Sequence, residues 1–186
     1  MIVEKNDTKS KILDTAERLI AQGGYGAFSF RDIADEIGIK SASVHYHFPT
    51  KSDLVAAVMV RYNEAFAQKL PNPDSGQAPQ MLINGFIDGF KAKIVDQRNM
   101  SLCTMLTADK ALLPMQVCNE LAMFYQLKLE WLTKVFFCNE RVDEDAARSQ
   151  AVQLLACLHG ASILVQGTDQ PELFDCALSE WRTHDR

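Results

Sequence analysis

The sequence lacks long hydrophobic runs. Its longest apolar stretch, LLACLHGASILV at 154–165, is too short and too interrupted to span a bilayer. The first residues, MIVEKNDTKSK, are charged and contain no apolar segment of the kind found in secretory signals. We therefore expect a cytoplasmic protein that does not enter a membrane.

Paired cysteines and cofactor signatures are also missing. The five cysteines, at 103, 118, 138, 157 and 176, form neither a disulfide framework nor a CxxC metal pattern. The GGYG segment at 23–26 is not followed by GK[ST], so it indicates a turn and not a phosphate loop. We find no Ser-His-Asp, paired-carboxylate or cofactor motif, and we expect a protein that is not an enzyme and holds no metal or cofactor.

Positive charge is scarce. The chain has a formal net charge of −5, which argues against a protein that coats nucleic acid indiscriminately. Residues 1–56 carry seven Lys and Arg against eight Asp and Glu, a formal charge of −1. Any DNA-binding surface there must therefore be local, with the acidic residues mostly on other faces and with binding that depends strongly on salt.

Strand-like alternation is absent, whereas helical periodicity runs through most of the sequence. This pattern predicts an all-α fold of about nine helices. The apolar fraction of 47% is ample for a core. PNPDSGQAP at 71–79 indicates a linker. The helices expected beyond it cover 80–98, 101–110, 115–138, 144–167 and 171–184.

Four helices are expected before the linker. The first begins near Thr8 or Ser10 and ends at Gly23-Gly24. Ser29, with Asp32 three residues later, predicts the start of a second helix that stops at Gly38. A third, short helix runs from Ser41 to just before Pro49, and a fourth follows through about Lys69.

Two short helices joined by a glycine-containing turn within a three-helix unit form a helix-turn-helix, whose second helix enters the major groove of DNA. The segment FSFRDIADEIGIKSASVHYHFPTKSDLV at 28–55, preceded by ILDTAERLIAQGGY, resembles the TetR-type transcriptional regulators. Family members usually have tyrosine where this chain has His45, a residue whose charge depends on pH. The resemblance implies a DNA-binding domain over 1–55 and a ligand-sensing and dimerisation domain over 56–186.

Residues around the turn are the DNA-binding candidates. Small side chains at 41–43 allow close approach to base edges, Val44 is expected to anchor the helix inward, and Lys51 at a helix start favours phosphate. The full set comprises Ser29, Arg31, Lys40, Ser41, Ala42, Ser43, His45, Tyr46, His47, Thr50 and Lys51.

The later helices are implied by the resemblance to hold a small-molecule effector and a homodimer interface. Aromatic, Met and Cys residues at helical spacing are the candidate effector-binding residues, although plain core is the more common use of such stripes. They are Phe86, Phe90, Cys103, Met105, Met123, Phe124, Leu127 and Trp131.

Apolar and small residues on the last two helices are the candidate dimer interface. They are Leu154, Leu155, Leu158, Ala161, Ser162, Val165, Leu178 and Trp181. The function implied is a repressor that binds a palindromic operator as a dimer and is released when an apolar or aromatic effector shifts its conformational population.

Other interpretations remain open from the residues. Cys103 and Cys118 flank the candidate effector region, so a cysteine-based sensor of oxidants or electrophiles is an alternative to plain buried cysteines. A helical adaptor that does not bind DNA is another. His159 indicates a core or interface histidine, with a ligand or pH-sensing role as its alternative. His45 and His47 point apart on a short helix, which disfavours a metal site.

Overall fold

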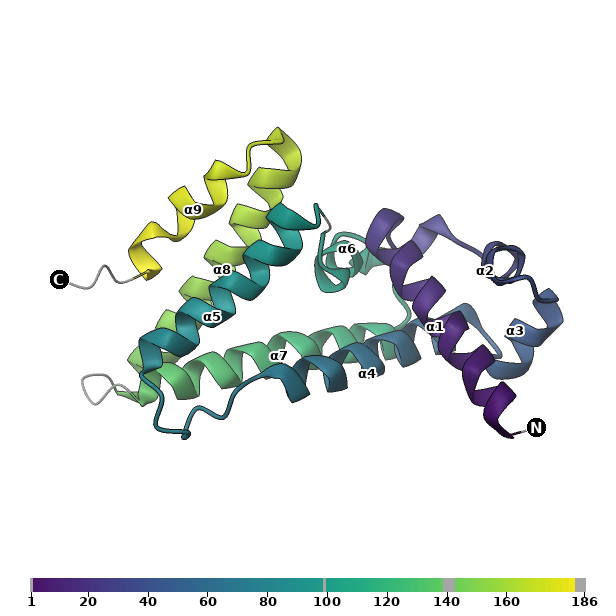
Figure 1. Ribbon diagram of the computed structural model, residues 1–186, viewed down its shortest axis with the longest axis horizontal. Coiled ribbons are helices and arrows are strands. Elements are labelled where there is room, and N and C mark those ends of the chain that lie inside the picture. The colour runs from purple at the N-terminus through teal and green to yellow at the C-terminus, as the bar shows by residue number, and fades with distance from the viewer. Residues whose placement is uncertain (1, 99, 139–142, 183–186) are drawn as a thin grey trace. The chain divides into compact units, whose positions relative to one another are not determined.

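The computed structural model describes residues 2–98, 100–138 and 143–182 (Figure 1). Within these ranges the chain forms nine α-helices and no strand, which confirms the all-α prediction. The helices are α1 Ile2–Gly23, α2 Phe30–Ile37, α3 Ser41–His47, α4 Lys51–Lys69, α5 Pro79–Lys91, α6 Leu102–Ala108, α7 Met115–Phe137, α8 Glu144–Thr168 and α9 Glu172–Leu178.

Helix ends differ from the expected ones in three places. Helix α1 begins at Ile2, before the capping residues expected at Thr8 or Ser10. After α5 the chain continues as a π-helical turn, Ala92–Asp96, in place of one regular helix to residue 98. Helix α9 gives way to a 3₁₀ turn, Ser179–Trp181. Part of the turn expected at 139–145 and the end of the helix expected to reach 184 lie outside the described residues.

The chain forms two compact units. The first comprises Met1–Ala67 with Ser101–Phe124, and the second comprises Gln68–Met100 with Tyr125–Arg186. The boundary expected at residue 55 divides the chain by function, into DNA binding and effector sensing, and not by packing. It stays a prediction.

The core of the first unit is built on α1. Ile12, Ala16 and Ile20 are fully buried at a spacing of four residues, one face of a helix. Helix α1 packs against α2, which buries Ile33, and also against α6. The packing of α1 against α2 thus holds the first helix of the helix-turn-helix in place.

The core of the second unit is built on α8, which lies beside α9 (Figure 1). Leu154 and Leu158 of α8 and Phe174 of α9 are fully buried. In α5 and α7, the rings of Phe86 and Trp131 stack with centroids 5.3 Å apart. The Trp131 indole donates a hydrogen bond of 2.8 Å to the Pro71 carbonyl, which holds the linker against the unit.

Helix α8 has the length and the mean hydropathy, 1.3, of a membrane-spanning helix. A core helix of a soluble protein meets the same criterion, and α8 buries eight residues inside its unit. Its apolar composition is therefore accounted for in part by packing within the chain.

Two glycines in the first unit adopt left-handed backbone conformations. Gly38 has φ 72° and ends α2, and Gly24 has φ 80° after α1. Asp109, at the end of α6, accepts a hydrogen bond of 2.7 Å from the Tyr25 amide. A Cβ atom on Gly24 would lie 2.2 Å from the Asp109 Oδ2 atom, whereas one on Gly38 would meet nothing within 4 Å. A side chain at position 24 would therefore have to displace the Asp109 carboxylate, in addition to adopting a positive φ.

Alanine substitutions should separate the effect of a positive φ from that of the close contact with Asp109. We expect Gly38→Ala to lower the free energy of unfolding by about 1–2 kcal/mol through backbone strain alone, and Gly24→Ala to lower it further because of the clash with Asp109. Gly85→Ala, in the exposed interior of α5 with open space around it, should raise the free energy of unfolding by about 0.5–1 kcal/mol. Urea denaturation measures all three.

The double variant Gly24→Ala/Asp109→Ala tests the cause of the effect. Removal of the carboxylate relieves the clash, so the double variant should lose less than the sum of the two single losses. Strictly additive losses would show that the two residues do not interact.

Candidate nucleic-acid interface and effector region

Helix α2 begins with a capping box. The Ser29 hydroxyl accepts from the Asp32 amide, and the Asp32 carboxylate accepts from the Ser29 amide at 2.7 Å. Hydrogen bonds from the Ser29 hydroxyl and amide lower the pKa of Asp32. This confirms the helix start predicted from the sequence, and it shows that the Ser29 side chain already serves the helix.

Helix α3 is held by two buried residues. Val44 has no exposed surface and Phe48, which follows the helix, is 4% exposed. The Gly38 amide donates a hydrogen bond to the Ala34 carbonyl oxygen and closes α2, so that the chain can turn into α3. Because Val44 fixes which side of α3 faces the core, the opposite side is presented outward.

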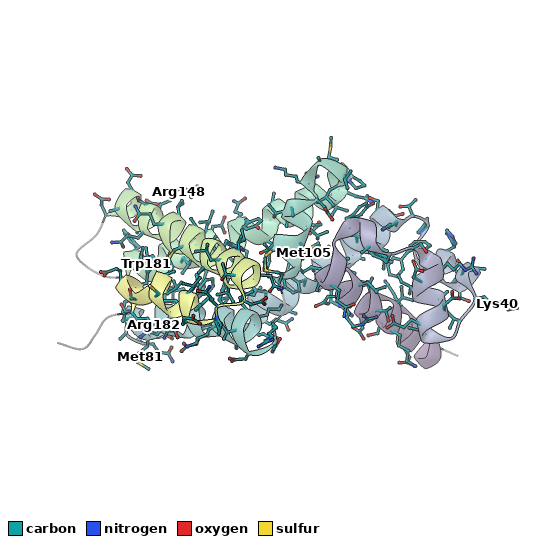
Figure 2. The ribbon with its side chains drawn as sticks, turned by 90° about the horizontal axis from the view of Figure 1, so that it is seen from above. Lys40, Met81, Met105, Arg148, Trp181 and Arg182 are labelled. Carbon is teal, nitrogen blue, oxygen red and sulfur yellow. The ribbon has the colours of Figure 1, made fainter. Side chains whose placement is uncertain are left out.

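The outward side of α3 carries the predicted DNA-contacting residues. Ala42, His45 and Tyr46 are exposed, with Tyr46 68% exposed, and the remaining α3 candidates are partly exposed. Lys40 precedes the helix and projects away from it (Figure 2). The arrangement therefore presents a polar, small-residue surface of the kind that enters a DNA groove.

The two histidines of α3 have different neighbours. The His45 ring packs edge-on against Phe30, with centroids 4.7 Å apart, whereas the His47 ring packs against Tyr46 at 5.4 Å. No group of three or more His, Cys, Asp or Glu residues suited to a metal ion occurs among the described residues.

The start of α4 is a second capping box. The Thr50 hydroxyl accepts from the Asp53 amide at 3.1 Å, and the Asp53 carboxylate accepts from the Thr50 amide at 3.0 Å. Hydrogen bonds, first from the Thr50 side chain, lower the pKa of Asp53. The Gln116 side chain of α7 donates to Asp53 and to Ser52, so the start of α7 is tied to the start of α4.

Lys51 is turned toward its own unit. Its ammonium donates to the Phe28 carbonyl and lies 4.2 Å and 4.8 Å from the ring centroids of Phe28 and Tyr25. Burial lowers the pKa of Lys51, against the opposing effect of Asp32. A structural role is therefore visible for Lys51, and its phosphate contact stays a prediction. The Arg31 side chain is 85% exposed, and its Nε atom lies 3.7 Å from the Asp35 Oδ2 atom.

The candidate effector-binding residues are divided between the two units. In the first unit Cys103 and Phe124 are buried, Met105 (Figure 2) is partly exposed, and Met123 is 59% exposed. The exposure of Met123 places it on the surface and not in an interior cluster. Phe124 instead packs against Tyr62 and Phe66, at 5.0 Å from each ring.

In the second unit the candidates join an aromatic cluster. Phe90 packs against Phe86 at 5.5 Å, and Phe86 stacks on Trp131. Leu127 is partly exposed. The His159 ring meets Phe90 edge-on at 5.5 Å and the Tyr125 ring at 5.4 Å. Segments from α5, α7 and α8 thus contribute rings to one cluster.

Lys128 belongs to this cluster and was not among the residues selected from the sequence. It is only 2% exposed, and its ammonium lies 4.7 Å from the Phe90 ring centroid and 5.9 Å from that of Tyr125. A sequence signal exists for it. Position 128 falls at the centre of the helical stripe that buries Val117, Leu121, Phe124, Leu132 and Val135.

The residues expected at a dimer interface lie inside the second unit. The six on α8 and Leu178 on α9 are all at most 7% exposed within a single chain. Trp181 (Figure 2) is partly exposed, packs against Phe136 at 6.0 Å and accepts a hydrogen bond from Gln80 at its backbone carbonyl. A residue that is already buried offers no surface to a second copy, so these residues form the core of the unit.

The cysteines occupy different environments. Cys103 is buried, with its sulfur 3.0 Å from the Ser101 hydroxyl, whereas Cys138 and Cys176 are exposed. Burial raises the pKa of the Cys157 thiol, which lowers its thiolate fraction.

Comparison with known proteins agrees with the geometry. Residues 12–58 match the family described as bacterial regulatory proteins, tetR family. The crystal structure of a TetR transcriptional regulator from Legionella pneumophila is 33% identical, with a TM-score of 0.86 over 94% of this chain and 95% of that one. This chain belongs to the TetR family. A TetR-family regulator from Agrobacterium tumefaciens, 27% identical, superimposes with a TM-score of 0.85 over 95% and 96% of the two chains.

A curated relative matches over a shorter range. The HTH-type transcriptional repressor KstR2 of Mycobacterium tuberculosis (strain CDC 1551 / Oshkosh) is 32% identical over 89 residues, which are 47% of this chain and 44% of that protein. The match thus spans less than half of the curated relative. TetR-family membership is established by the full-length structural relative from Legionella pneumophila.

Lys51 should contribute to stability as well as to any DNA contact. We expect Lys51→Ala to lower the free energy of unfolding by roughly 1–2 kcal/mol, through loss of one hydrogen bond and two ring contacts. Lys40→Ala, at an exposed position before α3, should change the free energy of unfolding by less than about 0.5 kcal/mol. Chemical denaturation compares the two, and equal stabilities would show that the Lys51 contacts contribute nothing.

Proposed function

We propose that this TetR-family protein is a cytoplasmic transcriptional repressor that binds a palindromic DNA operator as a homodimer and leaves it when a small molecule binds. The observation that carries the proposal is the orientation of α3, whose inward side is fixed by Val44 and whose outward side carries Ala42, His45 and Tyr46. The protein acts by binding, and no catalytic step is part of the proposal.

The two capping boxes support DNA binding by α3 and the start of α4. Both helix starts are closed by side chains of their own segments, so neither start needs DNA to satisfy these backbone amides. A preformed reading surface loses little conformational entropy when it binds. We assign the selection of bases to Ser41, Ala42 and Ser43. Contacts with the DNA phosphates are assigned to Tyr46 and to the start of α4.

The outer face of α8 is the proposed dimer surface. Val152, Ala156, Gly160, Ile163 and Leu164 are exposed and lie on the side of α8 opposite its buried leucines. Three are large apolar residues that are 47%, 56% and 51% exposed, at 152, 163 and 164. Ala156 and Gly160 leave room for close approach of a second helix. A twofold dimer would present two reading helices to half-sites about 34–36 Å apart.

Contacts within the first unit offer a route for regulation. Asp109 at the end of α6 holds the Tyr25 amide, and the Tyr25 ring lies under the Lys51 ammonium at the start of α4. A displacement of α6 would therefore act on the turn after α1 and on the segment that follows α3. An effector that favours the displaced state would lower operator affinity by the difference in its affinity for the two states.

Two kinds of variant should affect DNA binding differently. Tyr46→Ala should weaken binding to matched and mismatched operators alike, because a phosphate contact carries no sequence information. Ser43→Ala should change the ranking of base substitutions, by about 1–3 kcal/mol at the contacted position. Electrophoretic mobility shifts at fixed salt, on an operator selected from random DNA, measure both, with Gly85→Ala as a control that should bind like the wild type. Identical behaviour of the two variants would contradict the division of roles.

A charge on the outer face of α8 should prevent dimerisation. Ile163→Lys would place an unpaired ammonium in an apolar interface, and we expect a monomer by light scattering together with loss of operator binding. Met123→Lys is the matched control, because Met123 is similarly exposed, at 59%, and lies in the first unit. A dimer that survives Ile163→Lys and is lost in Met123→Lys would place the interface elsewhere.

A further inference from the structure

The first turn of α4 follows α3 directly. Phe48, Pro49 and Thr50 are the three residues between the two helices, and Phe48 is 4% exposed. Within the turn, the Thr50 hydroxyl and amide both donate to the Asp53 Oδ2 atom, at 2.7 Å and 3.0 Å. Because this turn is assigned to contact DNA phosphates, its orientation bears on how the protein is positioned on an operator.

Gln116 of α7 binds the same turn from outside α4. Its side-chain amide donates to the Ser52 hydroxyl and, at 3.2 Å, to the Asp53 Oδ1 atom. A side-chain amide has two N–H donors, enough for both partners. Hydrogen bonds, first from the Thr50 side chain and next from Gln116, lower the pKa of Asp53. Both oxygens of the Asp53 carboxylate are thus held, one by Thr50 and one by Gln116.

The rest of α7 fixes where Gln116 lies. Val117, the next residue, has no exposed surface. Glu120 and Phe124 follow Gln116 at intervals of four residues, which is one face of a helix. Both contact α4, since the Asn63 side chain donates to the Glu120 carbonyl at 3.2 Å and Phe124 packs against two rings at 5.0 Å. Gln116 therefore extends a contact between α7 and α4 as far as the first turn of α4.

The exposure of this contact separates positioning from stability. Gln116 is exposed, and Ser52 and Asp53 are partly exposed. Such hydrogen bonds contribute little to the free energy of unfolding, because water replaces them when they break. The ends of helices fray readily, however, and a turn that is ordered before DNA arrives does not have to be ordered on binding. Loss of the contact should therefore lower operator affinity more than it lowers stability.

We propose that Gln116 is a positioning residue for operator binding: by holding Ser52 and Asp53, it fixes the first turn of α4 in the orientation that contacts the DNA backbone. This inference rests on the proposed function, because it names a residue that prepares the DNA-binding surface without touching DNA.

The first experiment measures operator affinity by mobility shift at fixed salt, on variants shown by circular dichroism to fold. Gln116→Glu keeps the shape of the side chain but replaces its donors with a carboxylate that repels Asp53. Affinity should fall about 10-fold, as expected for the loss of one hydrogen bond to a charged group. Asn119→Glu is the matched control, because it adds the same charge at an exposed position of the same helix. Equal losses in the two variants would overturn the proposal.

A second substitution tests whether Gln116 acts through Asp53. The double variant Asp53→Asn/Gln116→Glu has the formal charge of the wild type and reverses the hydrogen bond. The new asparagine amide donates to the new carboxylate, while its carbonyl oxygen still accepts from Thr50. Affinity should return to within about threefold of the wild type. An undiminished loss from Gln116→Glu in the Asp53→Asn background would overturn the proposal.

Hydrogen exchange of the free protein tests the positioning without DNA. The Leu54 amide donates to the Thr50 carbonyl at 3.2 Å in the first turn of α4, and the Phe48 amide donates to the Val44 carbonyl at 2.9 Å at the end of α3. Gln116→Glu should accelerate exchange at Leu54 about 3- to 10-fold and leave Phe48 unchanged, because the opening is local. Equal acceleration at both amides, or none at Leu54, would overturn the proposal.

The two measurements separate this inference from the proposed function. A wild-type protein that recognises no operator, while Gln116→Glu still accelerates exchange at Leu54 alone, would refute the repressor and support the role of Gln116 in holding α4. A wild-type protein that binds its operator, and whose affinity and Leu54 exchange are unchanged by Gln116→Glu, would remain a repressor and refute the positioning role.

Discussion

The burial of Val44 is the constraint on which the DNA-binding surface depends. Helix α3 has seven residues, a length at which an isolated helix is not stable in water. Its position must therefore come from tertiary packing, and Val44 and Phe48 supply the buried contacts. Gly38 allows the chain to turn into α3, and the two capping boxes close the neighbouring helices without help from α3. A short helix held in this way can present small residues outward with no large side chain to block a groove.

The acidic balance of the N-terminal helices is compatible with DNA binding because many carboxylates are engaged within the protein. Asp32 and Asp53 close helix starts. Asp14 and Glu17 pair with Arg61 at 2.6 Å and 2.9 Å, and Glu36 pairs with Arg18. Lys40 and Tyr46 remain on the exposed side of the reading region. A formal charge of −1 over residues 1–56 therefore says little about the potential on that one side.

Local chemistry made the helix ends around the turn predictable. Ser29 with Asp32, Gly38 and Pro49 each act within a few residues, so the second and third helices began and ended where the sequence indicated. The start of α1 was placed too late, because polar residues near Thr8 resemble a cap but also fit the exposed side of a longer helix. The π-helical turn after α5 has no comparable local signal in the sequence.

Tertiary context decided what the sequence could not. Helix α8 has apolar residues on two sides, and periodicity alone does not tell which side faces the core. Its leucines Leu154, Leu155 and Leu158 are buried, whereas Ile163 and Leu164 on the other side are exposed. The position of Lys51 at a helix start predicts a phosphate contact, and the structure adds contacts of its ammonium with rings that lie about 25 residues away in the sequence. Periodicity places position 128 in the buried stripe of α7, but the rings near its ammonium, Phe90 of α5 and Tyr125 of α7, are brought there by tertiary packing.

An effector shifts the conformational balance only through contacts that differ between the two states. Allosteric coupling in proteins amounts to about 1–3 kcal/mol, a 5- to 150-fold change in affinity. A hydrogen bond to a charged group contributes about 1.5–3 kcal/mol, so one ion pair formed in only one of two states could account for the whole response. The same pair formed equally in both states would contribute binding and no regulation. The decisive quantity is therefore the difference between the effector's contacts in the operator-bound and released states, and the strength of effector binding by itself does not determine release.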